Sequence, residues 1–92
     1  MSSVSVSLSG ALATVAGTRK TEVDASDVSQ LLKALSTKFG SEFSDRLYDA
    51  NGKPRRFINI YVNGRDYRFL SRLETKLNAN DTISIIPAVS GG

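Results

Sequence analysis

The residues with the clearest chemical meaning stand at the end of the 92-residue sequence, where Val89 and Ser90 precede Gly91 and Gly92. Two glycines carry no Cβ atoms, so their backbone can enter a narrow channel and adopt almost any φ and ψ. A carboxylate at Gly92 would meet reagents without hindrance, and with a pKa of about 3.3–3.7 it would be ionised at neutral pH. Such a group can attack the α-phosphorus of ATP. It becomes an acyl donor only after that activation.

The activation would need chemistry that this chain lacks. An adenylate at Gly92 is an electrophile from which a persulfide sulfur could displace AMP and leave a thiocarboxylate. The sequence contains no cysteine and no histidine, which excludes thiolate zinc sites, cysteine nucleophiles and imidazole acid–base catalysis. We therefore expect a carrier and not an enzyme, with no bound cofactor and no metal site. The partner enzyme would supply the ATP, the Mg and the sulfur-bearing cysteine.

Composition favours one small globular domain. Hydrophobic residues make up 40% and charged residues 23%, and 12 Lys and Arg against 9 Asp and Glu give a net charge of +3. This charge is spread along the chain, so nucleic acid is not an expected partner. Residues 1–10 show neither a basic leader nor an apolar run, and no stretch approaches the roughly 18 apolar residues of a membrane span. We expect a cytoplasmic protein without a membrane segment.

Alternating apolar and polar side chains predict the strands. Their expected positions are residues 3–8, 19–24, 57–62, 66–69 and 82–86. Asn63-Gly64 is typical of a type I′ hairpin turn between the third and fourth strands. The small residues 10–17 and the turn formers at 49–54 are predicted to be loops.

The main helix is predicted at residues 28–39, because apolar side chains recur there at spacings of three and four. Asp27 or Ser26 could cap its start, and Gln30 would complete a capping box with Asp27. Gly40 is predicted to end it as a left-handed residue. Residues 41–48, with Phe43 and Leu47 inward, and residues 73–77 are predicted to form short helical turns.

This order of elements predicts an α+β fold of the β-grasp (ubiquitin-like) type. It has a mixed sheet of four to five strands with one main helix packed on one face, and the first and last strands would pair in parallel. Residues 1–87 would form the domain, and residues 88–92 a flexible Gly-Gly tail with a reach of about 17 Å.

The sequence resembles the MoaD/ThiS group of ubiquitin-like sulfur carriers. Residues 81–92, DTISIIPAVSGG, are similar to the ending of molybdopterin synthase small subunits. Residues 57–63, FINIYVN, with Arg68 and Phe69 downstream, are closer still to MoaD-like carriers of the CysO type, which feed sulfur to cysteine synthesis. Molybdopterin carriers commonly have two prolines before this ending, so the pair Pro87-Ala88 counts against a molybdopterin role.

The resemblance implies sulfur transfer through a thiocarboxylate at Gly92, which is made by an adenylating enzyme of the MoeB/ThiF type. The sulfur would pass to a synthase, either a cysteine synthase or the large subunit of molybdopterin synthase. Two other functions stay open: a protein modifier joined to target lysines through Gly92, and a plain interaction domain with an inert end.

A docking surface is predicted on the sheet face turned away from the helix. If Ile58, Ile60 and Val62 point to the core, then Phe57 and Tyr61 point the other way, and Ile86 lies opposite Ile83 and Ile85 in the same manner. We expect Phe57, Tyr61, Ile86 and Arg68 to contact the partner.

Overall fold

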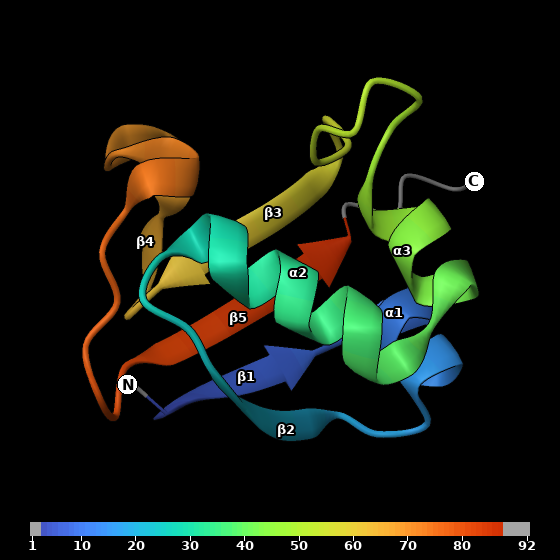
Figure 1. The fold of residues 1–92 in the computed structure, drawn as a ribbon, viewed down its shortest axis with the longest axis horizontal. Coiled ribbons are helices and arrows are strands. Elements are labelled where there is room, and N and C mark those ends of the chain that lie inside the picture. The colour runs from blue at the N-terminus through green and yellow to red at the C-terminus, as the bar shows by residue number, and fades with distance from the viewer. Residues whose placement is uncertain (1–2, 88–92) are drawn as a thin grey trace.

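The structure is a computed structural model that describes residues 3–87. Its one sheet has the strand order β2-β1-β5-β3-β4. The strands are β1 (Ser3–Leu8), β2 (Lys20–Asp24), β3 (Ile58–Val62), β4 (Arg65–Asp66) and β5 (Thr82–Pro87). The helices are α1 (Gly10–Ala16), α2 (Val28–Phe39) and α3 (Ser41–Leu47), with short 3₁₀ helices η1 (Tyr67–Phe69) and η2 (Arg72–Glu74). Figure 1 shows α2 lying across one face of the sheet.

The first and last strands occupy the middle of the sheet and run parallel, with Ser5 beside Thr82 and Leu8 beside Ile85. The other pairs, β1 with β2, β3 with β4 and β3 with β5, are antiparallel. The predicted mixed sheet and its parallel central pair are therefore confirmed. β5 lies between β1 and β3, but β1 pairs with it only as far as Ile85, so its last two residues, Ile86 and Pro87, pair with β3 alone.

The core lies between the sheet and the helices. The α2 side chains of Leu31, Leu32 and Leu35 and the β5 side chains of Ile83 and Ile85 are fully buried. Each such side chain contributes about 1.5–3 kcal/mol by leaving water. The apolar stripes that predicted these elements are therefore the surfaces that hold them together.

Asp27 caps the start of α2 as predicted, but Gln30 returns its hydrogen bond to Ser26, one residue before the cap, so the predicted capping box is only half formed. The Gln30 backbone N–H donates to Asp27 Oδ1 at 2.8 Å, and the Ser26 backbone N–H donates to Gln30 Oε1 at 3.0 Å. The end of α2 differs from the prediction, because Gly40 has φ 94° and ψ −174° and is not left-handed helical. This extended conformation with positive φ lets α3 begin directly at Ser41.

The prediction of a loop at residues 10–17 is wrong, because these residues form α1 up to Ala16. Small residues give no clear amphipathic pattern, yet Leu12 is buried and Ala13, Val15 and Ala16 pack against the core. Packing against the core therefore stabilises the helical conformation of residues 10–16. The short helical segment predicted at 41–48 is confirmed as α3, with Phe43 and Leu47 fully buried.

The strand predicted at residues 66–69 is also wrong in extent. β4 ends at Asp66, whose side chain accepts a hydrogen bond from the Arg68 backbone N–H at 2.8 Å and caps η1. Tyr67 is then buried, while Phe69 is exposed to 87%. The helical turn predicted at 73–77 is the shorter η2.

Among residues 3–87, no helix is both long enough and apolar enough to cross a membrane.

Candidate functional site

The predicted reactive segment, residues 88–92, follows directly after the end of β5. Pro87 is the last residue that the structure describes, and it lies beside Ile58 at the start of β3. The predicted reacting residue Gly92 and its neighbours Val89, Ser90 and Gly91 lie outside the described residues. The structure thus fixes the place from which the chain continues toward Gly92.

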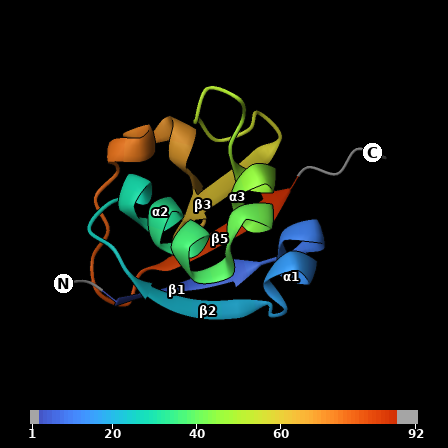
Figure 2. The same cartoon turned by 45° about the vertical axis from the view of Figure 1, so that its right-hand side comes forward.

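A cleft of about 760 Å³ opens beside Pro87. Its walls come from α1, α3, the loop before β3 and the strand ends. They include Ala11, Leu12, Asp45, Arg46, Asp49, Arg55, Arg56, Phe57, Ile58 and Pro87. Figure 2 shows the end of β5 lying beside α1 and α3. The cleft therefore combines apolar side chains with three arginines and two aspartates, next to the residue from which the chain continues toward Gly92.

The side chain of Asp49 stabilises the loop that forms one wall of the cleft. Asp49 Oδ1 accepts hydrogen bonds from the backbone N–H groups of Asn51 at 2.9 Å and Lys53 at 3.0 Å. The Arg55 guanidinium donates from Nε at 3.0 Å and from Nη2 at 2.9 Å to the Asp45 carbonyl oxygen. These bonds join the loop to α3, so the wall is a defined turn.

Two groups near this loop have shifted pKa values. The backbone N–H of Lys53 is the largest cause that lowers the pKa of Asp49, and the backbone N–H of Asn51 and the charges of Arg55 and Lys53 act in the same direction. Burial raises the pKa of Tyr48, and a hydrogen bond with the Ser36 side chain partly opposes this. Both groups keep their ordinary charge at neutral pH.

Of the predicted docking residues, Phe57 and Ile86 lie near the end of β5, and Tyr61 lies further along β3. Phe57 is 63% exposed and lines the cleft, and Ile86 is 42% exposed on the sheet face opposite the core. Tyr61 is half-buried on β3, and across the strands Asn59 faces Ile86 while Tyr61 faces Ser84. We call Phe57, Tyr61 and Ile86 the exit patch. Their role in partner contact stays a prediction.

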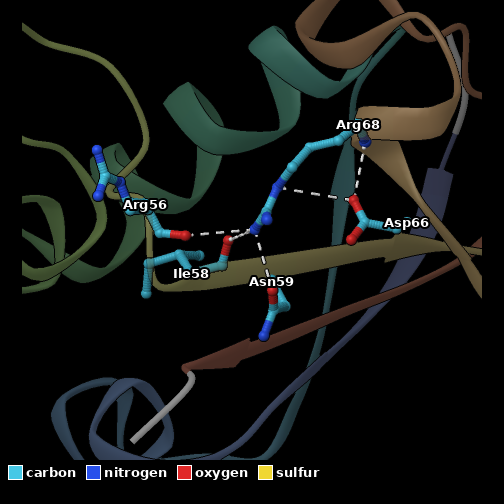
Figure 3. Close-up of polar contacts among 5 residues, drawn as sticks. All are labelled: Arg56, Ile58, Asn59, Asp66 and Arg68. Atoms are coloured by element: carbon cyan, nitrogen blue, oxygen red, sulfur yellow. Dashed lines mark hydrogen bonds and ion pairs between the residues drawn. The ribbon is translucent and has the colours of Figure 1, made fainter. Parts of the chain in front are cut away.

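Arg68 lies at the same edge, but its guanidinium is turned to its own chain. Its Nη2 donates to the Ile58 carbonyl oxygen at 2.9 Å and to Asn59 Oδ1 at 3.0 Å, as Figure 3 shows. The predicted contact between Arg68 and a partner is not tested by this geometry. What the structure shows is a contact with the first residues of β3.

Sequence reasoning missed the cleft and the part that Arg55 and Asp49 play in its wall. The turn formers at 49–54 did signal a turn, but no local pattern indicates that Arg55 reaches Asp45 on another element. The exposure of Phe69 also escapes sequence reasoning, because the alternation at 66–69 predicts a strand.

The described residues offer a binding surface. Within residues 3–87, no three metal-ligating side chains come together, and the sequence has no cysteine or histidine. The arrangement can present the following segment and dock an apolar or acidic partner surface.

Known proteins match this chain in sequence and in fold. A family model described as the ThiS family matches residues 6–92. Sulfur carrier protein CysO of Mycobacterium tuberculosis is 48% identical over 54 residues, which make up 56% of this chain and 58% of that protein.

Two solved structures extend the likeness over the whole fold. The small archaeal modifier protein 1 (SAMP1) of Methanosarcina acetivorans has 32% identity and a TM-score of 0.91, over 100% of this chain and 98% of that chain. The BexX/CysO complex of Amycolatopsis orientalis has 34% identity and a TM-score of 0.83, over 97% of this chain and 99% of the matched chain. These likenesses confirm the predicted β-grasp fold.

Proposed function

This chain belongs to the ThiS family, as its resemblance to the sulfur carriers predicted, and on this premise we propose that it carries sulfur as a thiocarboxylate at Gly92. The observation that supports this most directly is the position of Pro87. It ends a central strand beside a cleft and exposed apolar side chains, and the sequence that follows it leads to Gly91 and Gly92. The chain would act as the co-substrate of enzymes and not as an enzyme.

The proposed chemistry takes place in partner active sites. A carboxylate oxygen of Gly92 attacks the α-phosphorus of ATP, pyrophosphate leaves, and an acyl-adenylate forms. The terminal sulfur of a partner's cysteine persulfide then attacks the acyl carbon, and AMP leaves. A second thiolate attacks the inner sulfur of the resulting acyl disulfide, which releases the thiocarboxylate and leaves a disulfide on the partner. Because the first step consumes ATP, we place it in the cytoplasm.

The described residues would contribute recognition. The exit patch offers apolar and aromatic side chains, which are enriched at the centre of protein interfaces. Arg46, Arg55 and Arg56 line the adjacent cleft and would favour an acidic partner surface. An adenylating enzyme of the MoeB/ThiF type is the first partner that we propose.

The likeness to CysO supports a synthase of cysteine as the sulfur acceptor. The large subunit of molybdopterin synthase is the alternative acceptor. The structure of CysO with BexX shows that a similar carrier forms a complex with another protein. A pull-down with the natural protein, followed by identification of the co-purifying enzyme, separates these acceptors.

Intact-mass spectrometry tests the carrier proposal. The protein purified from its own cells should end at Gly92. Incubation with the activating enzyme, ATP and a sulfur donor should replace one oxygen of that residue by sulfur. Omission of ATP and deletion of Gly92 are the matched controls, and both should prevent the exchange. An unchanged mass with the cognate activating enzyme would refute the proposal.

The high structural similarity to SAMP1 favours one second candidate function, in which a lysine amine of a target protein captures the activated Gly92. This reaction forms an isopeptide bond and releases AMP. Digested cell extracts should then contain target peptides that carry the C-terminal remnant of this chain on lysine. Abundant thiocarboxylate without such remnants would exclude the modifier role. If deletion of Gly92 changes neither readout nor growth, the third prediction, a plain interaction domain, is correct.

A further inference from the structure

We propose that Arg68 is a positioning residue for the reaction at Gly92. Its guanidinium takes the place of a missing strand beside β3 and thereby fixes the end of β5. This inference rests on the proposed sulfur-carrier function. It assigns Arg68 a role within the chain, in place of direct contact with a partner.

The edge of β3 is only partly covered by its neighbour. β4 pairs with Tyr61 and Val62 and reaches no further along β3. The Asn63 N–H donates to the Thr82 carbonyl of the β5 side at 2.8 Å, and backbone groups alternate in direction along a strand. The backbone groups of Ile58 and Ile60 therefore point away from β5, toward the part of the β3 edge that β4 does not reach.

The Arg68 side chain fills this edge. Its Nη2 donates to the Ile58 carbonyl oxygen at 2.9 Å, to Asn59 Oδ1 at 3.0 Å and, at the longer distance of 3.4 Å, to the Arg56 carbonyl oxygen. Figure 3 shows these contacts converging on one end of the guanidinium. The Arg68 side chain thus donates to the Ile58 carbonyl, which points away from β5. It also orients the side chain of Asn59, which lies on the sheet face opposite the core.

The Arg68 side chain is held in place by contacts within its own chain. Its backbone N–H donates to Asp66 Oδ1 at 2.8 Å, and its Nε lies 3.8 Å from the same oxygen. Its guanidinium carbon lies 5.9 Å from the ring centroid of Tyr67, which is buried. The side chain of Arg68 is 34% exposed and that of Asp66 is 18% exposed, so water competes only in part for these contacts.

The two residues that Arg68 holds are the ones that pair with the end of β5. Ile58 lies opposite Pro87, and Asn59 lies opposite Ile86. Loss of the guanidinium would loosen the first residues of β3 and with them the last two described residues of β5. The point from which the chain continues toward Gly92 would then be less well fixed relative to the surface that a partner enzyme binds, and the reaction of a carboxylate depends on such positioning.

Amide hydrogen exchange tests the positioning of the strand ends without any partner. In Arg68→Met, we expect the amides of residues 58, 59 and 86 to exchange about tenfold faster than in the wild type, because their local opening becomes easier. The amides of Leu31 and Leu35 in α2 should keep their wild-type rates. Arg65→Met is the matched control, since it removes the same charge from an exposed side chain on β4. Unchanged exchange at all three amides would overturn the proposal.

Adenylation kinetics with the activating enzyme separate positioning from contact. For Arg68→Met we expect kcat to fall about tenfold while the KM for the carrier changes by less than about twofold. A raised KM with unchanged kcat would identify Arg68 as a contact residue and overturn the proposal. Faster exchange with unchanged kcat would also overturn it, because the role would then be structural only.

Arg68→Lys keeps the charge but not the planar fork of donors. We expect it to follow Arg68→Met in both measurements, and wild-type behaviour would overturn the proposed geometry. If the wild-type chain is not adenylated at all, the sulfur-carrier function fails. The exchange experiment still shows whether Arg68 holds the strand ends.

Discussion

At the scale of single residues, Asp49 shows how one carboxylate can organise a wall of the cleft. It is half-buried, and its side chain accepts two backbone hydrogen bonds that close the turn at residues 49–53. A hydrogen bond to a carboxylate favours the ionised form, which explains the direction of its pKa shift. The turn is therefore expected to weaken in acid.

The sign of this effect follows from the lowered pKa. The folded protein binds the Asp49 proton less readily than the unfolded chain does, so the contribution of Asp49 to stability is complete above its ordinary value of 3.8. It is lost as the pH falls below that value and through the lower pKa of the folded state. In Asp49→Asn the amide oxygen can still accept the two bonds, but it does not titrate.

We therefore expect the free energy of unfolding to fall less on acidification in Asp49→Asn than in the wild type. Urea unfolding at neutral pH and at about pH 3 measures this difference, because the two proteins differ only in the group at residue 49. Asp49→Ala, which accepts neither bond, should be less stable than Asp49→Asn at neutral pH. An equal acid response of wild type and Asp49→Asn would show that the turn does not depend on this charge.

At the scale of elements, the junction between α2 and α3 depends on one backbone conformation. Gly40 does not have the αL conformation that commonly ends a helix. Its φ of 94° and ψ of −174° turn the chain so that α3 begins at the next residue, Ser41. Its N–H donates to the Ser36 carbonyl at 2.9 Å, and its carbonyl accepts from the Ser44 N–H at 3.1 Å. This conformation is almost restricted to glycine.

Gly40→Ala should lower the free energy of unfolding by about 1–3 kcal/mol, which is the typical strain of a residue with a side chain in this region. A Cβ built at Gly40 meets no atom within 4 Å, so the effect would come from the backbone alone. Thermal or urea unfolding measures it. Thr37→Ala, on the exposed side of α2, is the control and should stay within about 0.5 kcal/mol. Equal stability of both variants would show that this junction can relax.

Elements with a strong side-chain period could be predicted from the sequence, and elements that depend on distant contacts could not. The alternation in β1, β3 and β5 and the apolar stripe of α2 each indicated a buried face, and the sheet uses those faces. α1 has no cap hydrogen bond from Ser9 and no charged residue in its first or last turn, so the left-handed Gly17 at its end is its main local signal, and the packing of Leu12 and its neighbours against the core holds it. The chain turns after Asp66 because of one side-chain hydrogen bond, which alternation cannot reveal.

In the candidate site, too, some features could be predicted from the sequence and others could not. The sequence predicted that Phe57 and Ile86 point away from the core, and their exposure agrees with this. It could not predict that Arg68 reaches Ile58 and Asn59, because those residues are ten and nine positions away in the chain. Long polar side chains choose partners only after the strands have paired.

At the scale of the whole molecule, the apolar residues divide into those that make the fold and those that it leaves exposed. The helices cover one face of the sheet, and on the other face Ile86 and the half-buried Tyr61 lie near small polar residues such as Ser84. Phe43 and Phe57 are chemically identical, but Phe43 is 0% exposed and Phe57 is 63% exposed. This pair allows stability and docking to be measured separately.

Phe43→Ala should lower the free energy of unfolding by about 3–5 kcal/mol, since it leaves a cavity in the core. Phe57→Ala should change it by less than about 0.5 kcal/mol, because most of that ring is already in water. Urea unfolding measures both, and Phe43→Leu replaces Phe43→Ala if the latter does not fold. If Phe57 docks the carrier, Phe57→Ala should raise the KM of the activating enzyme for the carrier by about fivefold or more, as expected for an aromatic interface residue. A large loss of stability in Phe57→Ala would show that this ring belongs to the fold, and an unchanged KM would remove it from the docking surface.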